Sequence, residues 1–188
     1  DTNVFQPLLH REESSMPIVL LVGSPHLRFK GFSDALKALK VVWDSGVRFK
    51  VHWICQQKSD LKMDFPITYF VQPKQDELVS IYQRADLLLC ASWYEGFGMP
   101  PLEAMACGTP VVATDSGGVQ EYALAGYNCL LSEPGDTGDL AKSVITLLQD
   151  STLKARLRVN GRATAQKFSY EHVMQQLERY MVNMVERN

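Results

Sequence analysis

Residues 87–112 read LLLCASWYEGFGMPPLEAMACGTPVV, and they set the fold class. They open with the apolar run 87–90, and a short apolar run without alternation is typical of a strand buried on both faces. After a glycine-rich turn, residues 100–107 are predicted to form a helix with proline in its first turn, where the missing N–H is harmless. Residues 110–113 form the next predicted strand. This order indicates parallel strands joined by a crossover helix.

The same alternation of strands and helices extends over the rest of the chain. The other predicted strands cover residues 18–22, 49–54, 67–71 and 129–131, and the other predicted helices cover residues 32–43, 78–82 and 136–148 and two later segments. Asp136 and Asp139 resemble a capping box at one helix start. We therefore expect an α/β protein of the doubly wound, Rossmann-like class, with a parallel sheet covered by helices on both faces. In such folds, ligands bind at the carboxyl ends of the strands.

Composition and charge indicate an ordinary folded domain. Hydrophobic residues make up 46% and charged residues 21%, which argues against disorder. The 188 residues suit one domain with a substantial core. A net charge of −2 gives no reason to expect nucleic acid as a partner. No apolar stretch reaches the roughly 18 residues that span a bilayer, and no charged start precedes an apolar run, so we expect no secretion signal.

Cysteine usage and basic residues bear on location. Four cysteines are spread without a close pair: Cys55, Cys90, Cys107 and Cys129. This spacing fits neither a zinc site nor a disulfide framework, and buried reduced thiols are expected. The expected location is the cytoplasm, with the cytoplasmic face of a membrane as the alternative. Three basic residues share one predicted helical face: Lys154, Arg158 and Arg162. A solvated surface is the default interpretation, and contact with an anionic membrane is the alternative.

The turn before residue 100 is suited to a phosphate-bearing ligand. Gly96 and Gly98 let the backbone turn tightly and approach a ligand. A helix that begins near Pro100 points free N–H groups and its positive dipole end toward this turn. Glu95 and Glu103 flank the turn, so they can reach a polyhydroxylated group and a ribose at opposite ends of one ligand. On spacing alone, the alternative that the glycines only shape a loop and the glutamates are surface charges has equal weight.

Residues 95–112 also resemble a known motif. EGFGMPPLE at 95–103, followed by AMACGTPVV at 104–112, is similar to the Glu-x7-Glu motif of the retaining glycosyltransferases of GT-B fold, the large group 1 family. Four further segments resemble that family: VLLVGSPHLRFKG at 19–31, ELVSIYQRADLLLCAS at 77–92, the Gly-Gly-x-x-Glu turn at 116–121 and NCLLSEPGD at 128–136. The resemblance covers nearly the whole chain.

The resemblance implies that this chain is the carboxy-terminal, nucleotide-sugar-binding half of a two-domain GT-B enzyme. Residues 1–16 then correspond to the interdomain connector and residues 17–168 to the Rossmann-like donor domain. Residues 169–188 correspond to a terminal helix, which either crosses toward the N-terminal domain or only covers this domain's sheet. Exposure of Tyr180 or Met184 would favour the crossing. The acceptor-binding domain is expected before Asp1 and is absent from this chain, so we expect the fragment alone to be inactive.

Roles for the donor-binding residues are also implied by the resemblance. Glu95 corresponds to the residue that contacts sugar hydroxyls, and Glu103 to the residue that accepts hydrogen bonds from the ribose. The turn completes the expected substrate-binding set: Gly96, Phe97, Gly98, Met99 and Pro100. The base is expected near the loop after Val71, against the backbone of Gln72 and Pro73.

A basic pair after the first strand grips the diphosphate in this family. Lys30 fills the lysine position. The family's arginine directly follows the glycine, where this chain has Ser24, and Arg28 is the candidate replacement. Lys30, Arg28 and Glu95 are therefore the expected catalytic residues, since cations stabilise the departing diphosphate where charge develops. The sequence has no Asp-x-Asp pair for a magnesium–diphosphate clamp, so we expect metal independence and no cofactor.

The leading hypothesis is a hexosyltransferase that uses a nucleoside diphosphate sugar, such as a UDP- or GDP-sugar, and an acceptor. One alternative is a non-catalytic nucleotide-sugar sensor or scaffold. Ser24 keeps this alternative open, although the presence of Lys30, Glu95 and Glu103 argues against it. The other alternative is a GT-B epimerase or phosphorylase. The expected partners are the nucleotide sugar and the absent N-terminal acceptor domain.

Overall fold

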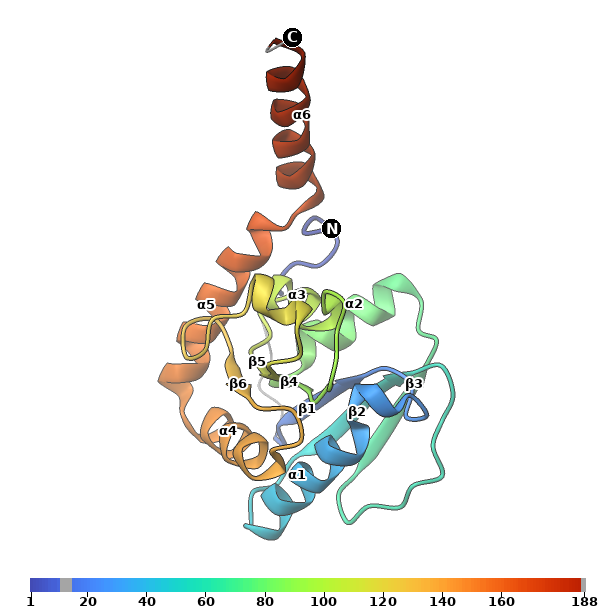
Figure 1. The fold of residues 1–188 in the computed structure, drawn as a ribbon. Helices are drawn as coiled ribbons and strands as arrows, with labels where there is room; N and C mark the ends of the chain where they lie inside the picture. Colours follow the sequence, from blue (N-terminus) through green and yellow to red (C-terminus); the bar gives the residue numbers. More distant parts are fainter. Residues whose placement is uncertain (11–14, 187–188) are drawn as a thin grey trace.

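The computed structural model describes residues 1–10 and 15–186, and within them it contains one parallel sheet in the order β3-β2-β1-β4-β5-β6 (Figure 1). The strands are β1 (Ile18–Val22), β2 (Lys50–Cys55), β3 (Ile67–Val71), β4 (Leu87–Cys90), β5 (Val111–Thr114) and β6 (Leu130–Ser132). Every strand pair is parallel. The strands predicted from apolar runs are all present, with ends displaced by at most one residue.

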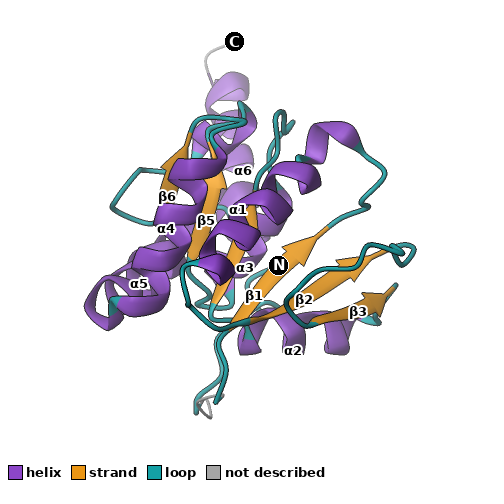
Figure 2. Ribbon diagram, turned by 90° about the horizontal axis from the view of Figure 1, so that it is seen from below, coloured by secondary structure: helices purple, strands orange, loops and turns teal. Residues whose placement is uncertain are grey.

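Helices cover both faces of this sheet. They are α1 (Phe32–Asp44), α2 (Gln75–Arg84), α3 (Met99–Ala106), α4 (Thr137–Gln149), α5 (Ser151–Lys167) and α6 (Tyr170–Glu186), with short 3-10 turns η1 (Arg28–Lys30) and η2 (Gly118–Glu121). α1 and α4 pack side by side on one face, whereas α2, α3 and α5 cover the other (Figure 2). The predicted doubly wound α/β class is confirmed.

The central strands are apolar at successive positions because both of their faces are buried. In β1, Val19 and Leu21 pack into the core under α1 and α4. Leu20 lies in the second core, under α2, α3 and α5. All three side chains are fully buried. In a strand with one solvated face, apolar and polar residues would alternate. The continuous apolar run therefore indicates a sheet that is covered on both faces.

The strand order places a switch point between β1 and β4. From β1 the chain continues to β2 and β3 on one side of the sheet, and β4 begins the series that continues to β5 and β6 on the other. The loops that leave the carboxyl ends of β1 and β4 therefore lie next to each other. In open α/β sheets this crevice is where ligands bind.

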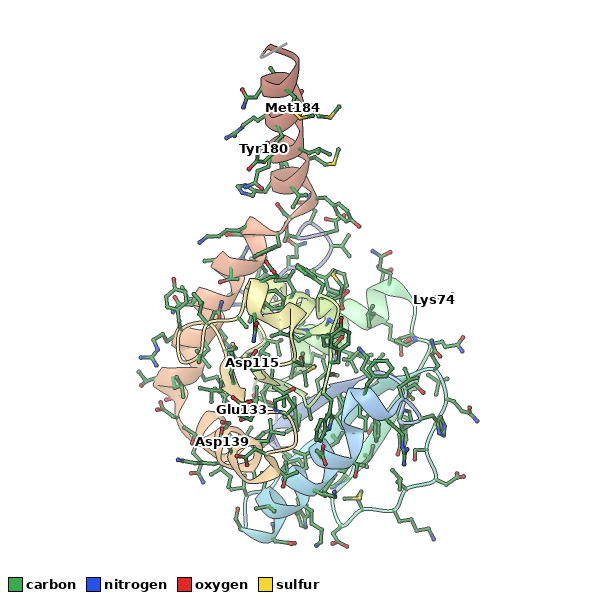
Figure 3. The ribbon with its side chains drawn as sticks, in the orientation of Figure 1. Lys74, Asp115, Glu133, Asp139, Tyr180 and Met184 are labelled. Atoms are coloured by element: carbon green, nitrogen blue, oxygen red, sulfur yellow. The ribbon has the colours of Figure 1, made fainter. Side chains whose placement is uncertain are left out.

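The two ends of the chain lie outside the sheet. Residues 11–14 of the expected connector and residues 187–188 of the expected terminal helix lie outside the described residues. α6 projects away from the helices that cover the sheet, and its Tyr180 and Met184 are 71% and 66% exposed (Figure 3). No helix within residues 1–10 and 15–186 combines the length and the apolar character that crossing a membrane requires. The division into connector, domain and terminal helix stays a prediction.

Candidate functional site

The turn that joins β4 to α3 is shaped by Gly98. This residue has a φ of 84°, in the left-handed region that favours glycine. A Cβ atom at Gly98 would lie 2.8 Å from the hydroxyl oxygen of Tyr122, which donates a hydrogen bond of 2.5 Å to the Gly98 carbonyl oxygen. Gly96 differs, because a Cβ atom there would meet nothing within 4 Å. The turn therefore requires glycine at position 98. At position 96 a Cβ atom would have room, so packing does not require glycine there.

A second loop, after β5, supports the backbone of Glu95 from both sides. The Glu95 N–H donates to the Ser116 carbonyl oxygen at 2.8 Å, and the Gly118 N–H donates to the Glu95 carbonyl oxygen at 2.9 Å. A Cβ atom at Gly118 would lie 2.2 Å from the Gly96 carbonyl oxygen. The two glycine-containing loops therefore touch backbone to backbone, and only a glycine at 118 permits this contact.

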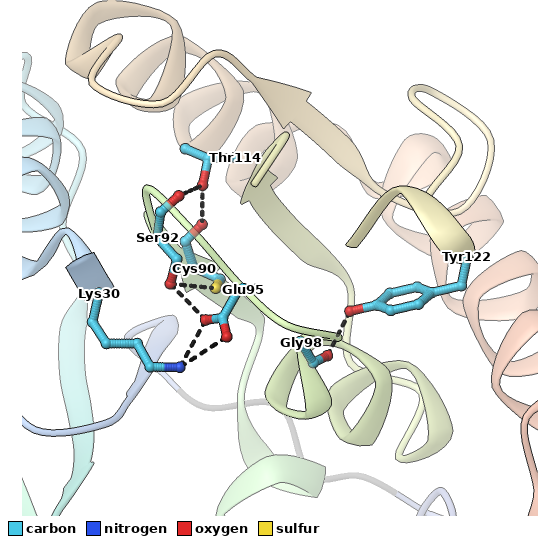
Figure 4. A network of polar contacts seen from close by, with 7 residues as sticks. All are labelled: Lys30, Cys90, Ser92, Glu95, Gly98, Thr114 and Tyr122. Carbon is cyan, nitrogen blue, oxygen red and sulfur yellow. Dashed lines mark hydrogen bonds and ion pairs between the residues drawn. The ribbon is translucent and has the colours of Figure 1, made fainter. Parts of the chain in front are cut away.

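The structure brings Glu95 and Lys30 together at the switch point. Glu95 is 8% exposed, and Lys30 Nζ lies 2.8 Å from its Oε1 and 3.0 Å from its Oε2 (Figure 4). Lys30 ends η1 in the loop after β1, and Glu95 lies in the loop after β4. The pair therefore joins the two loops that the strand order makes neighbours. A carboxylate and a cation therefore lie in direct contact at this edge of the sheet.

Ser92 completes this cluster, and sequence reasoning did not identify it. Its hydroxyl donates to Glu95 Oε1 at 2.7 Å, and the residue is 1% exposed. Thr114, at the end of β5, donates to the Ser92 carbonyl oxygen and also approaches the Cys90 carbonyl oxygen at 3.4 Å. The available signal was the polar residue directly after the apolar run of β4, three positions before Glu95.

Glu103 makes a different contact, on α3. Its Oε2 accepts a hydrogen bond of 2.8 Å from the hydroxyl of Tyr82 on α2. Burial raises the pKa of the Glu103 carboxyl, and the hydrogen bond from Tyr82 opposes that shift without cancelling it. Burial also raises the pKa of Tyr82 well above its ordinary value, so this hydroxyl keeps its proton and remains a donor. Sequence reasoning did not identify Tyr82.

The start of α3 carries fewer N–H donors than a helix start without proline. Gly98 is the N-cap residue and makes no side-chain capping bond, and the helix opens with Met99, Pro100 and Pro101. Proline has no N–H, so Met99 is the donor among these three helical residues. The two prolines therefore reduce the number of free N–H groups that this helix start can point toward the turn. The substrate-binding roles expected of Phe97, Gly98 and Met99 stay predictions.

The remaining expected site residues lie along the same edge. Arg28 begins η1 and is exposed, two residues before Lys30. Gln72 follows the edge strand β3 with a φ of 48°, which is unusual for a residue other than glycine. Its N–H donates to the Cys55 carbonyl oxygen at 3.0 Å. Gln72 and Pro73 therefore follow a strand that β2 separates from β1.

A small cavity lies beside Glu103 at the start of α3. Glu103, Met99 and Phe168 line a cavity of about 30 Å³, which has the size of a water molecule. Two larger cavities in the described part of the chain measure about 350 and 240 Å³, and neither is lined by Lys30, Glu95 or Glu103. Within the same residues, no group of three or more His, Cys, Asp or Glu side chains is placed to hold a metal ion. An elongated ligand would lie across the edge.

Comparisons with known proteins agree on the type of fold. The family model described as glycosyl transferases group 1 matches residues 10–164. The D-inositol 3-phosphate glycosyltransferase of Rhodococcus opacus (strain B4) is 30% identical over 174 residues, which are 92% of this chain and 39% of that protein. Sucrose-phosphate synthase from Thermosynechococcus elongatus has a TM-score of 0.81 at 25% identity, over 100% of this chain and 51% of that chain.

A further solved structure shares the fold at lower identity. Anabaena Alr3699/HepE, in complex with UDP-glucose, has a TM-score of 0.79 at 21% identity, over 97% of this chain and 55% of that chain. The chain therefore spans about two fifths of the curated relative and about half of each solved chain.

Proposed function

Because the chain belongs to the group 1 glycosyltransferase family, we propose that it is the donor-binding half of a retaining, metal-independent hexosyltransferase. The donor is a nucleoside diphosphate sugar. The acceptor is bound mainly by a second, N-terminal domain of the same polypeptide. The observation that carries the proposal is the contact between Lys30 and Glu95 at the switch point between β1 and β4.

Lys30 and Glu95 can contact the two sides of the sugar–phosphate bond, Lys30 the phosphate and Glu95 the sugar. A lysine ammonium group has three N–H donors. Two donor contacts go to the Glu95 carboxylate, so the third N–H can bind a phosphate oxygen. The Glu95 carboxylate accepts hydrogen bonds from hydroxyl groups of the sugar, because an ionised carboxylate is an acceptor only. Arg28 is exposed in the same loop and provides a second cation.

The chemistry follows from where charge develops. Breaking the bond between the sugar and the diphosphate leaves an oxocarbenium-like sugar and a departing nucleoside diphosphate with one more negative charge than the donor. Lys30, Arg28 and the positive end of the α3 dipole stabilise that leaving group. Glu103, farther along α3, accepts hydrogen bonds from the ribose of the same ligand. The complex of Alr3699/HepE with UDP-glucose makes UDP the first nucleotide to test.

A ligand panel tests the proposal. Thermal unfolding of the chain is measured with UDP, GDP and ADP and with their glucose conjugates, because a bound ligand raises stability by mass action. Calorimetry then gives the affinity of each nucleotide that binds. We expect Glu103→Ala to weaken binding of the nucleotide and its sugar conjugate alike. Glu95→Ala should weaken binding of the sugar conjugate selectively. If the unsubstituted chain binds none of the six ligands, the proposed function is wrong.

A further inference from the structure

Each of the two motif carboxylates accepts a hydrogen bond from a buried hydroxyl group of a neighbouring element. Ser92, two residues beyond β4, donates to Glu95 Oε1 at 2.7 Å, and Tyr82 on α2 donates to Glu103 Oε2 at 2.8 Å. Ser92 is 1% exposed and Tyr82 is 0% exposed. A buried hydroxyl group held in one place fixes the direction of the carboxylate that it contacts.

Ser92 is itself held by two neighbours. The Thr114 hydroxyl donates to the Ser92 carbonyl oxygen, which fixes the backbone of Ser92 at the end of the sheet. The Cys90 sulfur lies 3.5 Å from Ser92 Oγ. Burial raises the pKa of the Cys90 thiol, so it keeps its proton and can donate to that oxygen. The proton of the Ser92 hydroxyl is then directed to Glu95 (Figure 4).

These contacts leave a defined part of Glu95 for a ligand. A carboxylate offers about four acceptor positions. Ser92 and Lys30 share Oε1, and Lys30 also contacts Oε2, so three positions are used and one on Oε2 remains. On Glu103, the Tyr82 contact occupies Oε2 and leaves Oε1 for another donor. Both carboxylates are therefore oriented before a ligand binds, which lowers the entropic cost of binding.

We propose that Ser92 and Tyr82 are positioning residues for two different parts of the donor. Ser92 orients Glu95 toward the sugar, and Tyr82 orients Glu103 toward the ribose. This inference rests on the proposed function and adds two residues to it. Loss of the two hydroxyl groups should therefore have different effects on a nucleotide and on its sugar conjugate.

The test compares Ser92→Ala and Tyr82→Phe by calorimetry with UDP and UDP-glucose, or with the corresponding pair from the panel that the chain prefers. Ser92→Ala should weaken UDP-glucose about tenfold, the effect of losing one hydrogen bond to a charged group, and leave UDP within about twofold. Tyr82→Phe should weaken both ligands about tenfold. Ser92→Thr keeps a hydroxyl group and should restore most of the affinity for UDP-glucose.

A matched control separates positioning from stability. Thr164 has a buried hydroxyl that accepts from Asn128 Nδ2 at 2.9 Å and donates to the Asn160 carbonyl oxygen at 3.0 Å. Thr164→Val should lower the melting temperature and leave both affinities unchanged. If Ser92→Ala does not fold, the ratio of the two affinities is measured on Ser92→Cys, which replaces the hydroxyl with a weaker donor and should show the same selective loss.

The possible failures are distinguishable. If the unsubstituted chain binds the nucleotide and its sugar conjugate but Ser92→Ala or Ser92→Cys loses both equally, or loses neither, Ser92 does not position Glu95. Equal affinities of Tyr82→Phe and the unsubstituted chain for UDP would exclude the role of Tyr82. Both results would leave the proposed function intact. Absence of binding by the unsubstituted chain would overturn the proposed function and this inference together.

Discussion

At the scale of single residues, Glu103 is a carboxyl group whose ionised form is disfavoured by burial. Burial raises its carboxyl pKa above the ordinary glutamate value, and the Tyr82 hydroxyl opposes that shift only in part. The folded protein therefore binds a proton at this residue at a higher pH than the unfolded chain does. In the proposed site, ligand binding needs the ionised form of Glu103, whereas the protonated form favours the folded state. Stability and affinity should thus respond to pH in opposite directions at this residue.

We expect UDP affinity to fall as the pH is lowered through the raised pKa of Glu103. The contribution of Glu103 to the free energy of unfolding should increase over the same interval, because the folded state binds more protons there. Calorimetry and urea unfolding from about pH 4 to about pH 8 measure both quantities. Glu103→Gln should remove the Glu103 part of both dependences. A pH profile of UDP affinity that Glu103→Gln leaves unchanged would assign the titration to another group.

Gly118 provides a second prediction at this scale. A Cβ atom there would lie 2.2 Å from the Gly96 carbonyl oxygen, and backbone atoms cannot move aside as a flexible side chain can. Gly118→Ala should therefore lower the free energy of unfolding by about 2 kcal/mol or more, together with UDP-glucose affinity. Gly96→Ala is the control, because its Cβ meets nothing within 4 Å, and its unfolding free energy should stay within about 0.5 kcal/mol. If urea unfolding shows that Gly96→Ala lowers the free energy of unfolding as much as Gly118→Ala does, the contact of Gly118 with Gly96 does not explain the loss.

At the scale of secondary structure elements, most of the fold could be predicted because its strands and helices leave clear periodic patterns. The apolar run of β4 and the helical spacing in α1 each match an observed element. The short turns η1 and η2 have no such period and were not predicted. The contact of Tyr82 was also missed, because it depends on how α2 packs on α3. The contact of Ser92 with Glu95 is local, three positions apart, but a polar residue after a strand has no period that marks it. Lys30 and Glu95 could be placed at one edge because each follows the carboxyl end of a predicted parallel strand.

The start of α4 contains a sequence pattern that predicts more contacts than the structure has. Asp136 and Asp139 resemble a capping box, but only half of it forms. The Asp136 carboxylate accepts from the Asp139 N–H at 2.9 Å, whereas the Asp136 N–H donates to the Glu133 carbonyl oxygen at 3.1 Å. The Asp139 side chain is therefore not needed for the cap.

We therefore expect Asp136→Ala to lower the free energy of unfolding by about 1 kcal/mol, the usual effect of losing an N-cap. Asp136→Ser should retain most of that stability, because serine is also a good N-cap residue. Asp139→Ala is the matched control and should change stability by only a few tenths of a kcal/mol, through the helix dipole. Urea unfolding measures all three. A loss from Asp139→Ala as large as that from Asp136→Ala would mean that the full box operates.

At the scale of the whole molecule, the chain covers about half of each solved structure that it matches. We expect it to bind a nucleotide sugar but not to transfer the sugar, because closure of two domains normally assembles such sites. Mass spectrometry of products after incubation with UDP-glucose and a panel of saccharide acceptors measures transfer. Transfer by the 188-residue chain alone would contradict this expectation. The exposed apolar residues of α6, including Tyr180 and Met184, fit an expected crossing to the second domain.

Metal independence is a further prediction for the molecule as a whole. Lys30, Arg28 and the start of α3 replace a magnesium ion at the diphosphate in the proposed site. UDP-glucose affinity measured with EDTA should therefore equal the affinity measured with added magnesium. Loss of binding in EDTA that magnesium restores would show that a metal ion bridges the diphosphate to the protein.

The central position of β1 also has a consequence for the order of folding. β1 pairs with β2, its next strand along the chain, and with the distant β4, where Val19 faces Leu87. Closing the longer loop lowers chain entropy before the pairing can compensate, so such contacts form slowly. Lys30 and Glu95, 65 positions apart, meet only across that second pairing. A newly synthesised chain therefore forms its ligand-binding site late in folding. The ligand cannot stabilise the first steps of folding, because its site does not yet exist.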